Sequence, residues 1–165
     1  MKLDLKKFDA SRLTPTSVIL IVGKRGTGKT TLLKDLLWHL KDKLDFGIAM
    51  SPTEDSTQAL TSIVPPTCIY NDYNPSAIDV LLQIQRQTVK SGNFRHCYLI
   101  LDDCMATSKK NMKDDNIREI FMNGRHRKLC FLNCVQYLVD LCPALRTNVD
   151  FVFSLRENII SNKAK

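Results

Sequence analysis

The stretch Gly23-Lys24-Arg25-Gly26-Thr27-Gly28-Lys29-Thr30 decides the fold, because it fits the phosphate-loop pattern G-x-x-x-x-G-K-[ST]. Residues 18–22, directly before it, are five apolar residues typical of a strand buried on both faces of a parallel sheet. After it, leucines recur at helical spacing between positions 32 and 44, with Lys and Asp filling most of the other side. The sequence therefore predicts the strand, loop and helix that this motif requires.

The loop residues predict contacts to a nucleoside triphosphate. The three glycines allow tight turns, so that backbone N–H groups and the positive end of the following helix face a phosphate. We expect Lys29 to reach the β- and γ-phosphates, Thr30 to ligate Mg²⁺, and Thr31 to hydrogen-bond the α-phosphate. The predicted binding set is Gly23, Gly26, Thr27, Gly28, Lys29, Thr30 and Thr31. The flanking strand and helix argue against an accidental glycine-rich turn.

Apolar runs alternate with helical patterns along the rest of the chain. Strands are predicted at 46–50, 97–101, 129–135 and 151–153, and a weaker one at 68–70. Helices are predicted from Asn74 to Gly92, with Ser76 and Asp79 spaced like a capping box, and over 114–123. This alternation predicts an α/β protein with a mostly parallel central sheet and helices on both faces.

The bulk composition fits one domain over residues 1–165, in which 1–15 form an N-terminal lead-in. Hydrophobic residues make up 44% and charged residues 25%, so disorder is not expected. The N-terminus does not resemble a signal peptide, and no segment approaches the roughly 20 apolar residues of a membrane span. We therefore expect a soluble, intracellular protein whose six cysteines are reduced core residues.

The formal net charge of +7 suggests an anionic partner, and nucleic acid is the natural candidate. One basic group consists of Lys109, Lys110 and Lys113, and another of Arg125, Arg127 and Lys128. A solvated basic surface without a nucleic-acid partner explains the same composition about equally well.

Asp102 and Asp103 directly follow an apolar run, about seventy residues after the phosphate loop. The carboxyl ends of parallel strands form the crevice where open α/β sheets bind ligands. We expect Asp102 to hold Mg²⁺, through water, and Asp103 to polarise the attacking water as a general base. The alternative is a simple turn after a strand, where Asp is common.

Two further kinds of side chain are candidates for the reaction. Gln136 is the preferred sensor of the γ-phosphate and Asn133 the second choice, although either amide could instead satisfy backbone groups at a strand end. Arg125, Arg127 and Arg146 are candidates for an arginine finger, which stabilises transition-state charge and is often supplied by a neighbouring subunit. A surface salt bridge or a DNA-phosphate contact explains any single arginine as well or better.

The order of GKRGTGKT, CYLILDDCM, NGRHRKLCFLNCVQY and ALRTNVDFVFSLRENII resembles the poxvirus-type genome-packaging ATPases of large DNA viruses, in the FtsK/HerA superfamily. The resemblance covers roughly residues 16–160. It implies an ASCE/RecA-like, three-layer P-loop NTPase fold. It places Lys29 and Thr30 on the phosphate loop, Asp102 and Asp103 on the metal and water carboxylates, and Gln136 on the sensor position.

The resemblance also implies a function: a Mg²⁺-dependent ATPase that assembles into a homo-oligomeric ring and drives double-stranded DNA into a capsid. Capsid, portal or membrane-associated virion proteins are then possible partners, and the host cytoplasm, viral factory or virion is the expected location. Many superfamily members have Glu where this chain has Asp103, and they usually continue past Arg156-Glu157-Asn158, so a truncated C-terminal region is expected here.

Three alternatives remain. The most serious is a module that binds ATP and DNA without efficient turnover. A small-molecule kinase would need an arginine-bearing lid and a substrate pocket that the sequence does not reveal. A GTP switch would need an Asn-Lys-x-Asp motif, and Asn162-Lys163-Ala164-Lys165 lacks the Asp.

Overall fold

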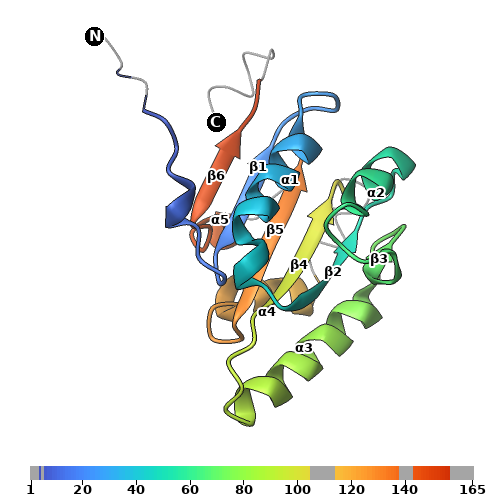
Figure 1. Ribbon diagram of the computed structural model, residues 1–165, viewed down its shortest axis with the longest axis vertical. Coiled ribbons are helices and arrows are strands. Elements are labelled where there is room, and N and C mark those ends of the chain that lie inside the picture. Colours follow the sequence, from blue (N-terminus) through green and yellow to red (C-terminus); the bar gives the residue numbers. More distant parts are fainter. Residues whose placement is uncertain (1–3, 5, 105–113, 138–142, 157–165) are drawn as a thin grey trace.

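The computed structural model describes residues 4, 6–104, 114–137 and 143–156. In this part of the chain, six strands form one sheet with the order β3-β2-β4-β5-β1-β6, and every neighbouring pair is parallel (Figure 1). The strands are β1 Val18–Val22, β2 Phe46–Met50, β3 Ile69–Tyr70, β4 Cys97–Asp102, β5 Leu129–Val135 and β6 Phe151–Ser154. The predicted α/β fold with a parallel sheet is confirmed.

Helices cover both faces of the sheet (Figure 1). The helices α1 Lys29–Leu40 and α2 Glu54–Leu60 pack on one face, which we call the α1 face. The helices α3 Pro75–Lys90, α4 Asp115–Asn123 and α5 Pro143–Arg146 pack on the other, the α3 face. Three short 3-10 helices, η1 Ala10–Arg12, η2 Lys41–Lys43 and η3 Pro66–Cys68, lie in the connections.

The central strands show why their sequences are almost entirely apolar. Along β1, Val18 and Leu20 pack into the core of the α3 face, and Ile19 and Ile21 pack into the core of the α1 face. All seven residues of β5 are buried in the same way. A strand covered on both faces needs apolar side chains at nearly every position, because successive side chains point to opposite faces; Asn133 in β5 is the polar exception.

Most predicted elements are present, with two differences. Helix α3 is capped by Asn74, whose side chain accepts a hydrogen bond from the Ala77 N–H at 3.0 Å, so the predicted capping box at Ser76 is wrong. With Pro75 at the first helical position, Asn74 is the residue that faces the unpaired amides. Helices α2 and α5 were not predicted.

The parallel arrangement brings the carboxyl ends of all strands to one edge of the sheet, the carboxyl edge, and their starts to the opposite amino edge. The lead-in before β1 packs beside β6, where the Phe8 ring meets those of Phe151 and Phe153 edge to face. Among the described residues, no helix is long and apolar enough to cross a membrane.

Candidate functional site

The phosphate loop connects β1 to α1 at the carboxyl edge. Gly26 and Gly28 have φ angles of +76° and +94°, a left-handed conformation that disfavours residues with a Cβ. Thr27 Oγ1 donates to the Lys24 carbonyl at 2.7 Å and fixes the turn. Gly28 caps α1 without a side-chain hydrogen bond, so the first amides of this helix are available to an anion.

Gly23 is required for a different reason, which is space. A Cβ at this position would lie 2.6 Å from Thr27 Oγ1 and 2.9 Å from Leu155 Cβ. The Gly23 N–H donates to the Val135 carbonyl at the end of β5, at 3.1 Å. The loop is therefore held closely between the ends of β5 and β6.

Lys29 is buried, with 5% of its side chain exposed, and its ammonium group faces the carboxyl edge. Nζ donates to the carbonyls of Gly23 at 2.9 Å and Lys24 at 3.3 Å. It also forms an ion pair with Asp103 Oδ2 at 3.1 Å. The structure thus brings the lysine of the loop and the second acidic residue into direct contact.

Thr30 makes the second link between the loop and the acidic pair. Its hydroxyl donates to Asp102 Oδ2 at 3.1 Å. Asp102 is the last residue of β4 and is only 2% exposed. The predicted metal ligands Thr30 and Asp102 are therefore adjacent, although 72 residues separate them in sequence. Thr31 is exposed on the first turn of α1.

Asp103 has a left-handed backbone, with φ of 55°, that turns the chain away from the sheet. Burial raises the pKa of its carboxyl group, and the Lys29 charge and hydrogen bond oppose this rise. The Asp102 carboxylate raises the pKa further, and the Gln136 side chain lowers it. Oδ1 is buried and, within the described structure, has no hydrogen-bond partner. An unsatisfied carboxylate oxygen at this edge is suited to accept a proton from a bound water.

The two candidate sensors lie in different surroundings. Gln136 directly follows β5 and interacts with Asp103, so it belongs to the site. Asn133 is 1% exposed and its register partners, Leu20 and Leu101, are core residues of the α3 face. Both polar atoms of its amide lack a hydrogen-bond partner in the described structure. The strand alternation therefore turns Asn133 away from the loop.

Two of the three candidate arginines lie at the opposite edge of the sheet. Arg125 pairs with Asp150, which precedes β6, and Asp150 Oδ2 also accepts the Val18 N–H at 2.9 Å at the start of β1. Arg127 pairs with Glu119 at 3.1 Å. Arg125 and Arg127 thus lie at the amino edge, and Arg146 is the last residue of α5, shortly before β6 begins. Lys109, Lys110 and Lys113 lie outside the described residues.

The residues at the carboxyl edge fit a Mg²⁺ ion bound together with a nucleotide. A hydroxyl and a carboxylate are adjacent here, and Mg²⁺ prefers oxygen ligands while retaining several waters. In the described residues, no group of three or more His, Cys, Asp or Glu could hold a metal ion. A metal at this edge would therefore need oxygens from phosphates and water in addition to Thr30 and Asp102.

The sequence interpretation missed two hydroxyls beside the site. Ser56 of α2 lies 3.4 Å from Thr30, measured between the two Oγ atoms. Ser51, directly after β2, is fully buried. The helix-start signal was present, because Thr53 is followed by Glu54 and Asp55, an N-cap residue with acidic residues in the first turn.

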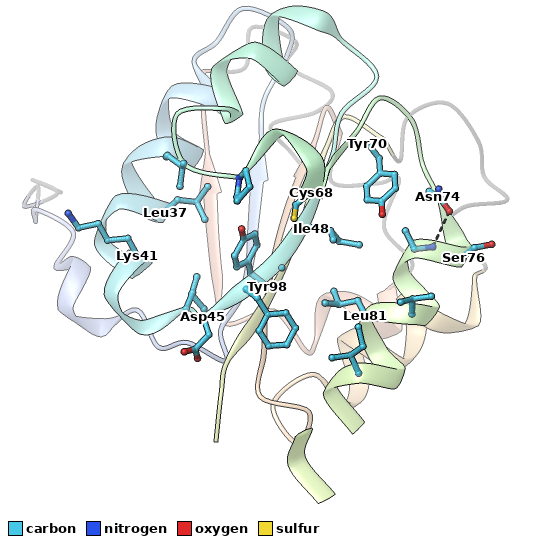
Figure 2. Close-up of a pocket in the computed structure, with 18 residues that line it drawn as sticks. Leu37, Lys41, Asp45, Ile48, Cys68, Tyr70, Asn74, Ser76, Leu81 and Tyr98 are labelled. Atoms are coloured by element: carbon cyan, nitrogen blue, oxygen red, sulfur yellow. Dashed lines mark hydrogen bonds between the residues drawn. The ribbon is translucent and has the colours of Figure 1, made fainter. Parts of the chain in front are cut away.

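A large cavity lies elsewhere, beside β2 and β3 and between the end of α1 and α3 (Figure 2). Its volume is about 680 Å³, and apolar and aromatic side chains such as Ile48, Tyr70, Leu81 and Tyr98 line it. Neither the phosphate loop nor the acidic pair contributes to its lining. It is therefore separate from the site described above.

Several solved structures share this fold. The genome packaging NTPase B204 from Sulfolobus turreted icosahedral virus 2, in complex with ATP-gammaS, aligns with a TM-score of 0.65 at 21% identity. The alignment covers 91% of this chain and 79% of that one. The cytoplasmic domain of EssC aligns with a TM-score of 0.70 at 15% identity, over 90% of this chain and 34% of that one. The fold is that of P-loop NTPases.

Relatives by sequence occur in large DNA viruses. The chain is 35% identical over 170 residues to the uncharacterized protein 075L of Invertebrate iridescent virus 6, covering 96% of this chain and 65% of the relative. It is 35% identical over 152 residues to the uncharacterized protein 015R of Frog virus 3 (isolate Goorha), covering 89% and 46%. The chain thus spans less than two thirds of the length of these relatives. Residues 5–163 match the family described as Poxvirus A32 protein, and the chain belongs to this family.

Proposed function

We propose that this chain is a Mg²⁺-dependent ATPase that couples ATP hydrolysis to the translocation of double-stranded viral DNA into capsids. The activity belongs to one domain over residues 1–165, which works as part of a homo-oligomeric ring inside the infected cell or in the virion. Membership of the Poxvirus A32 protein family and the fold shared with a genome packaging NTPase in complex with ATP-gammaS support this proposal.

One observation carries the proposal: the phosphate loop and the acidic pair meet at two points. Lys29 contacts Asp103 at 3.1 Å, and Thr30 contacts Asp102 at 3.1 Å. Phosphoryl transfer requires a positive charge and a metal on the phosphate oxygens and a positioned water, rather than covalent catalysis. These four side chains are the types that such a reaction needs, within a single cluster.

Each residue then has a separate task. The first amides of α1 and the Lys29 ammonium bind the triphosphate. Lys29 then leaves its ion pair with Asp103 and contacts phosphate oxygens instead. Thr30 and Asp102 would hold Mg²⁺, which would supply positive charge to neutralise the negative charge that develops on the phosphates. Asp103 takes a proton from the attacking water, and Gln136 orients that water and contacts the γ-phosphate. Arg125, Arg127 or Arg146 would act only from a neighbouring subunit.

The test is ATP hydrolysis by wild type, Lys29→Ala and Asp103→Asn, with and without double-stranded DNA. We expect DNA to stimulate the wild type, and each substitution to lower kcat/KM by roughly 100- to 1,000-fold. Exposed residues distant from the site provide matched controls: Lys90→Ala at the end of α3 and Asp42→Asn in η2 should hydrolyse ATP at the wild-type rate.

A second function competes with this one, namely binding of ATP and DNA without efficient turnover. The positions of two candidate fingers favour it for an isolated subunit, since Arg125 and Arg127 lie at the amino edge. Hydrolysis that is unaffected by DNA and by Asp103→Asn, combined with ATP binding that Lys29→Ala abolishes, would establish the binding module and rule out the motor.

A further inference from the structure

The end of β2 carries a buried hydroxyl without a partner. Ser51 is 0% exposed, and its Oγ has no hydrogen bond within the described structure. Ala49 packs into the core of the α1 face and Met50 into the other core, so alternation places the Ser51 side chain on the α1 face. Met50 is in register with Leu101 on β4, and the next position on that strand is Asp102. Asp102 is in register with Cys134, which packs on the α1 face, so Ser51 and Asp102 occupy neighbouring positions on the same face of the sheet.

A second hydroxyl reaches the same place from α2. Ser56 Oγ lies 3.4 Å from Thr30 Oγ1, which itself donates to Asp102. The segment is held in position, because Thr57 Oγ1 donates to the Ser51 carbonyl at 3.3 Å and Leu60 is buried in the core. The connection from β2 to α2 therefore forms one side of the nucleotide site.

We infer that Ser51 and Ser56 bind the water shell of the Mg²⁺ ion that Thr30 and Asp102 would hold. This inference rests on the proposed function. Mg²⁺ loses its waters reluctantly and usually keeps several of them, and each water needs acceptors in the protein. A serine hydroxyl both donates and accepts, so it can orient a metal-bound water without adding charge.

The energetics at Ser51 support a role in ligand binding. A buried polar group without a partner is destabilising, and an alanine at this position would carry no such cost. Buried hydroxyls are normally satisfied by protein or water. Ser51 and the predicted metal ligand Asp102 occupy neighbouring positions at the carboxyl edge. A bound ion with its waters would therefore supply the hydrogen-bond partner that Ser51 Oγ lacks.

The test is Mn²⁺ binding to the complex with ATP-gammaS, measured by electron paramagnetic resonance for wild type, Ser51→Ala and Ser56→Ala. Loss of an outer-shell partner lowers metal affinity by about 10- to 100-fold in known sites, and we expect a loss of about tenfold. Affinity for ATP-gammaS in EDTA should stay within about twofold of wild type, since neither hydroxyl contacts the phosphates. Ser56→Thr, which keeps the hydroxyl, should restore Mn²⁺ affinity.

Two controls separate this inference from the proposed function. Ser62→Ala removes an exposed hydroxyl just after α2, which donates to the Ala59 carbonyl, and should leave Mn²⁺ affinity unchanged. Thr30→Ala removes a predicted metal ligand and should abolish Mn²⁺ binding to the complex with ATP-gammaS. If wild type and Thr30→Ala bind Mn²⁺ equally, the proposed function fails. If Thr30→Ala loses binding while Ser56→Ala equals wild type, only the present inference is overturned. Ser56→Ala decides the outcome even if Ser51→Ala does not fold.

Discussion

The carboxyl and amino edges of the sheet differ in how their polar side chains are exposed and paired. At the carboxyl edge, Lys29 and Asp102 are 5% and 2% exposed, and Asp103 Oδ1 and Ser51 Oγ lack a partner in the described structure. At the amino edge, Arg125 is 63% exposed and already pairs with Asp150. The carboxyl edge thus holds two such buried oxygens close to the phosphate loop, whereas the Arg125–Asp150 pair at the amino edge is exposed on its arginine side and already formed.

This difference indicates where a ligand belongs. Buried polar groups without hydrogen-bond partners lower the stability of the free protein. A ligand that supplies the missing hydrogen bonds removes this cost, so several such groups in one place indicate a binding site. Exposed ion pairs contribute little and can be exchanged freely with solvent or a partner. The carboxyl edge is therefore suited to binding and chemistry, and the amino edge to stability and contact with other molecules.

The largest effect is expected for the pH dependence of catalysis, which tests whether Asp103 acts as the base at the carboxyl edge. Its pKa is raised above the ordinary value of 3.8, chiefly by burial, so it takes up a proton at a higher pH than an exposed Asp. As a general base it must be deprotonated, and kcat/KM should fall tenfold per pH unit below that raised pKa. A pH profile of kcat/KM over pH 4–8 measures this, and a profile that is flat down to pH 4 would remove Asp103 from the reaction.

The same pKa shift predicts a stability effect of definite sign. The folded protein binds this proton more tightly than the unfolded chain, so the contribution to stability is complete below pH 3.8 and is lost as the pH rises through the raised pKa. Asp103→Asn cannot titrate and should lack this decline. Urea unfolding of both proteins without nucleotide, at several pH values, provides the comparison; parallel curves would contradict the assignment.

A smaller effect is expected at the amino edge, where Glu119 holds two arginines. Its Oε1 accepts from Arg127 Nε at 3.2 Å and Nη2 at 3.1 Å, and its Oε2 pairs with Arg86 of α3. Glu119→Ala leaves both arginines without this carboxylate, and should lower the free energy of unfolding by about 1–3 kcal/mol. ATP affinity should not change.

The matched control for Glu119 is Asp35, which forms an exposed pair with His39 within α1 at 4.0 Å. Asp35→Ala should cost at most about 0.5 kcal/mol. Equal destabilisation by the two substitutions, measured by denaturant unfolding, would show that the Glu119 network adds nothing beyond an ordinary surface pair.

The fold was predictable because its signals are local. Each central strand is an almost entirely apolar run, and the loop motif fixes how β1 connects to α1. Helix α2 was not predicted because it has only seven residues and one buried residue, Leu60, so no periodic apolar stripe marks it. The cap of α3 was misplaced because Asn, Pro and Ser in succession offer two start positions, and only the backbone geometry selects Asn74.

The site was predictable only in part, for a related reason. Lys29, Thr30, Asp102 and Asp103 belong to motifs whose position on strands and loops implies that they meet. The choice between Gln136 and Asn133 depends on which face each side chain occupies, and that requires the strand register. Ser51 and Ser56 follow no motif, since hydroxyls are common at strand and helix ends, and only the packing of α2 against α1 brings Ser56 near Thr30.

The smallest effect on stability is expected for Arg125. Its pair with Asp150 is exposed, so Arg125→Ala should lower the free energy of unfolding by about 0–1 kcal/mol. The five residues of β1 separate the amino edge from the phosphate loop, about 17 Å at 3.3 Å per residue. Arg125 therefore cannot reach a nucleotide bound in its own subunit. Arg125→Ala should leave ATP affinity unchanged and should reduce hydrolysis only at protein concentrations where subunits associate. A loss of hydrolysis that is the same at all concentrations would mean that the two edges are coupled within one subunit.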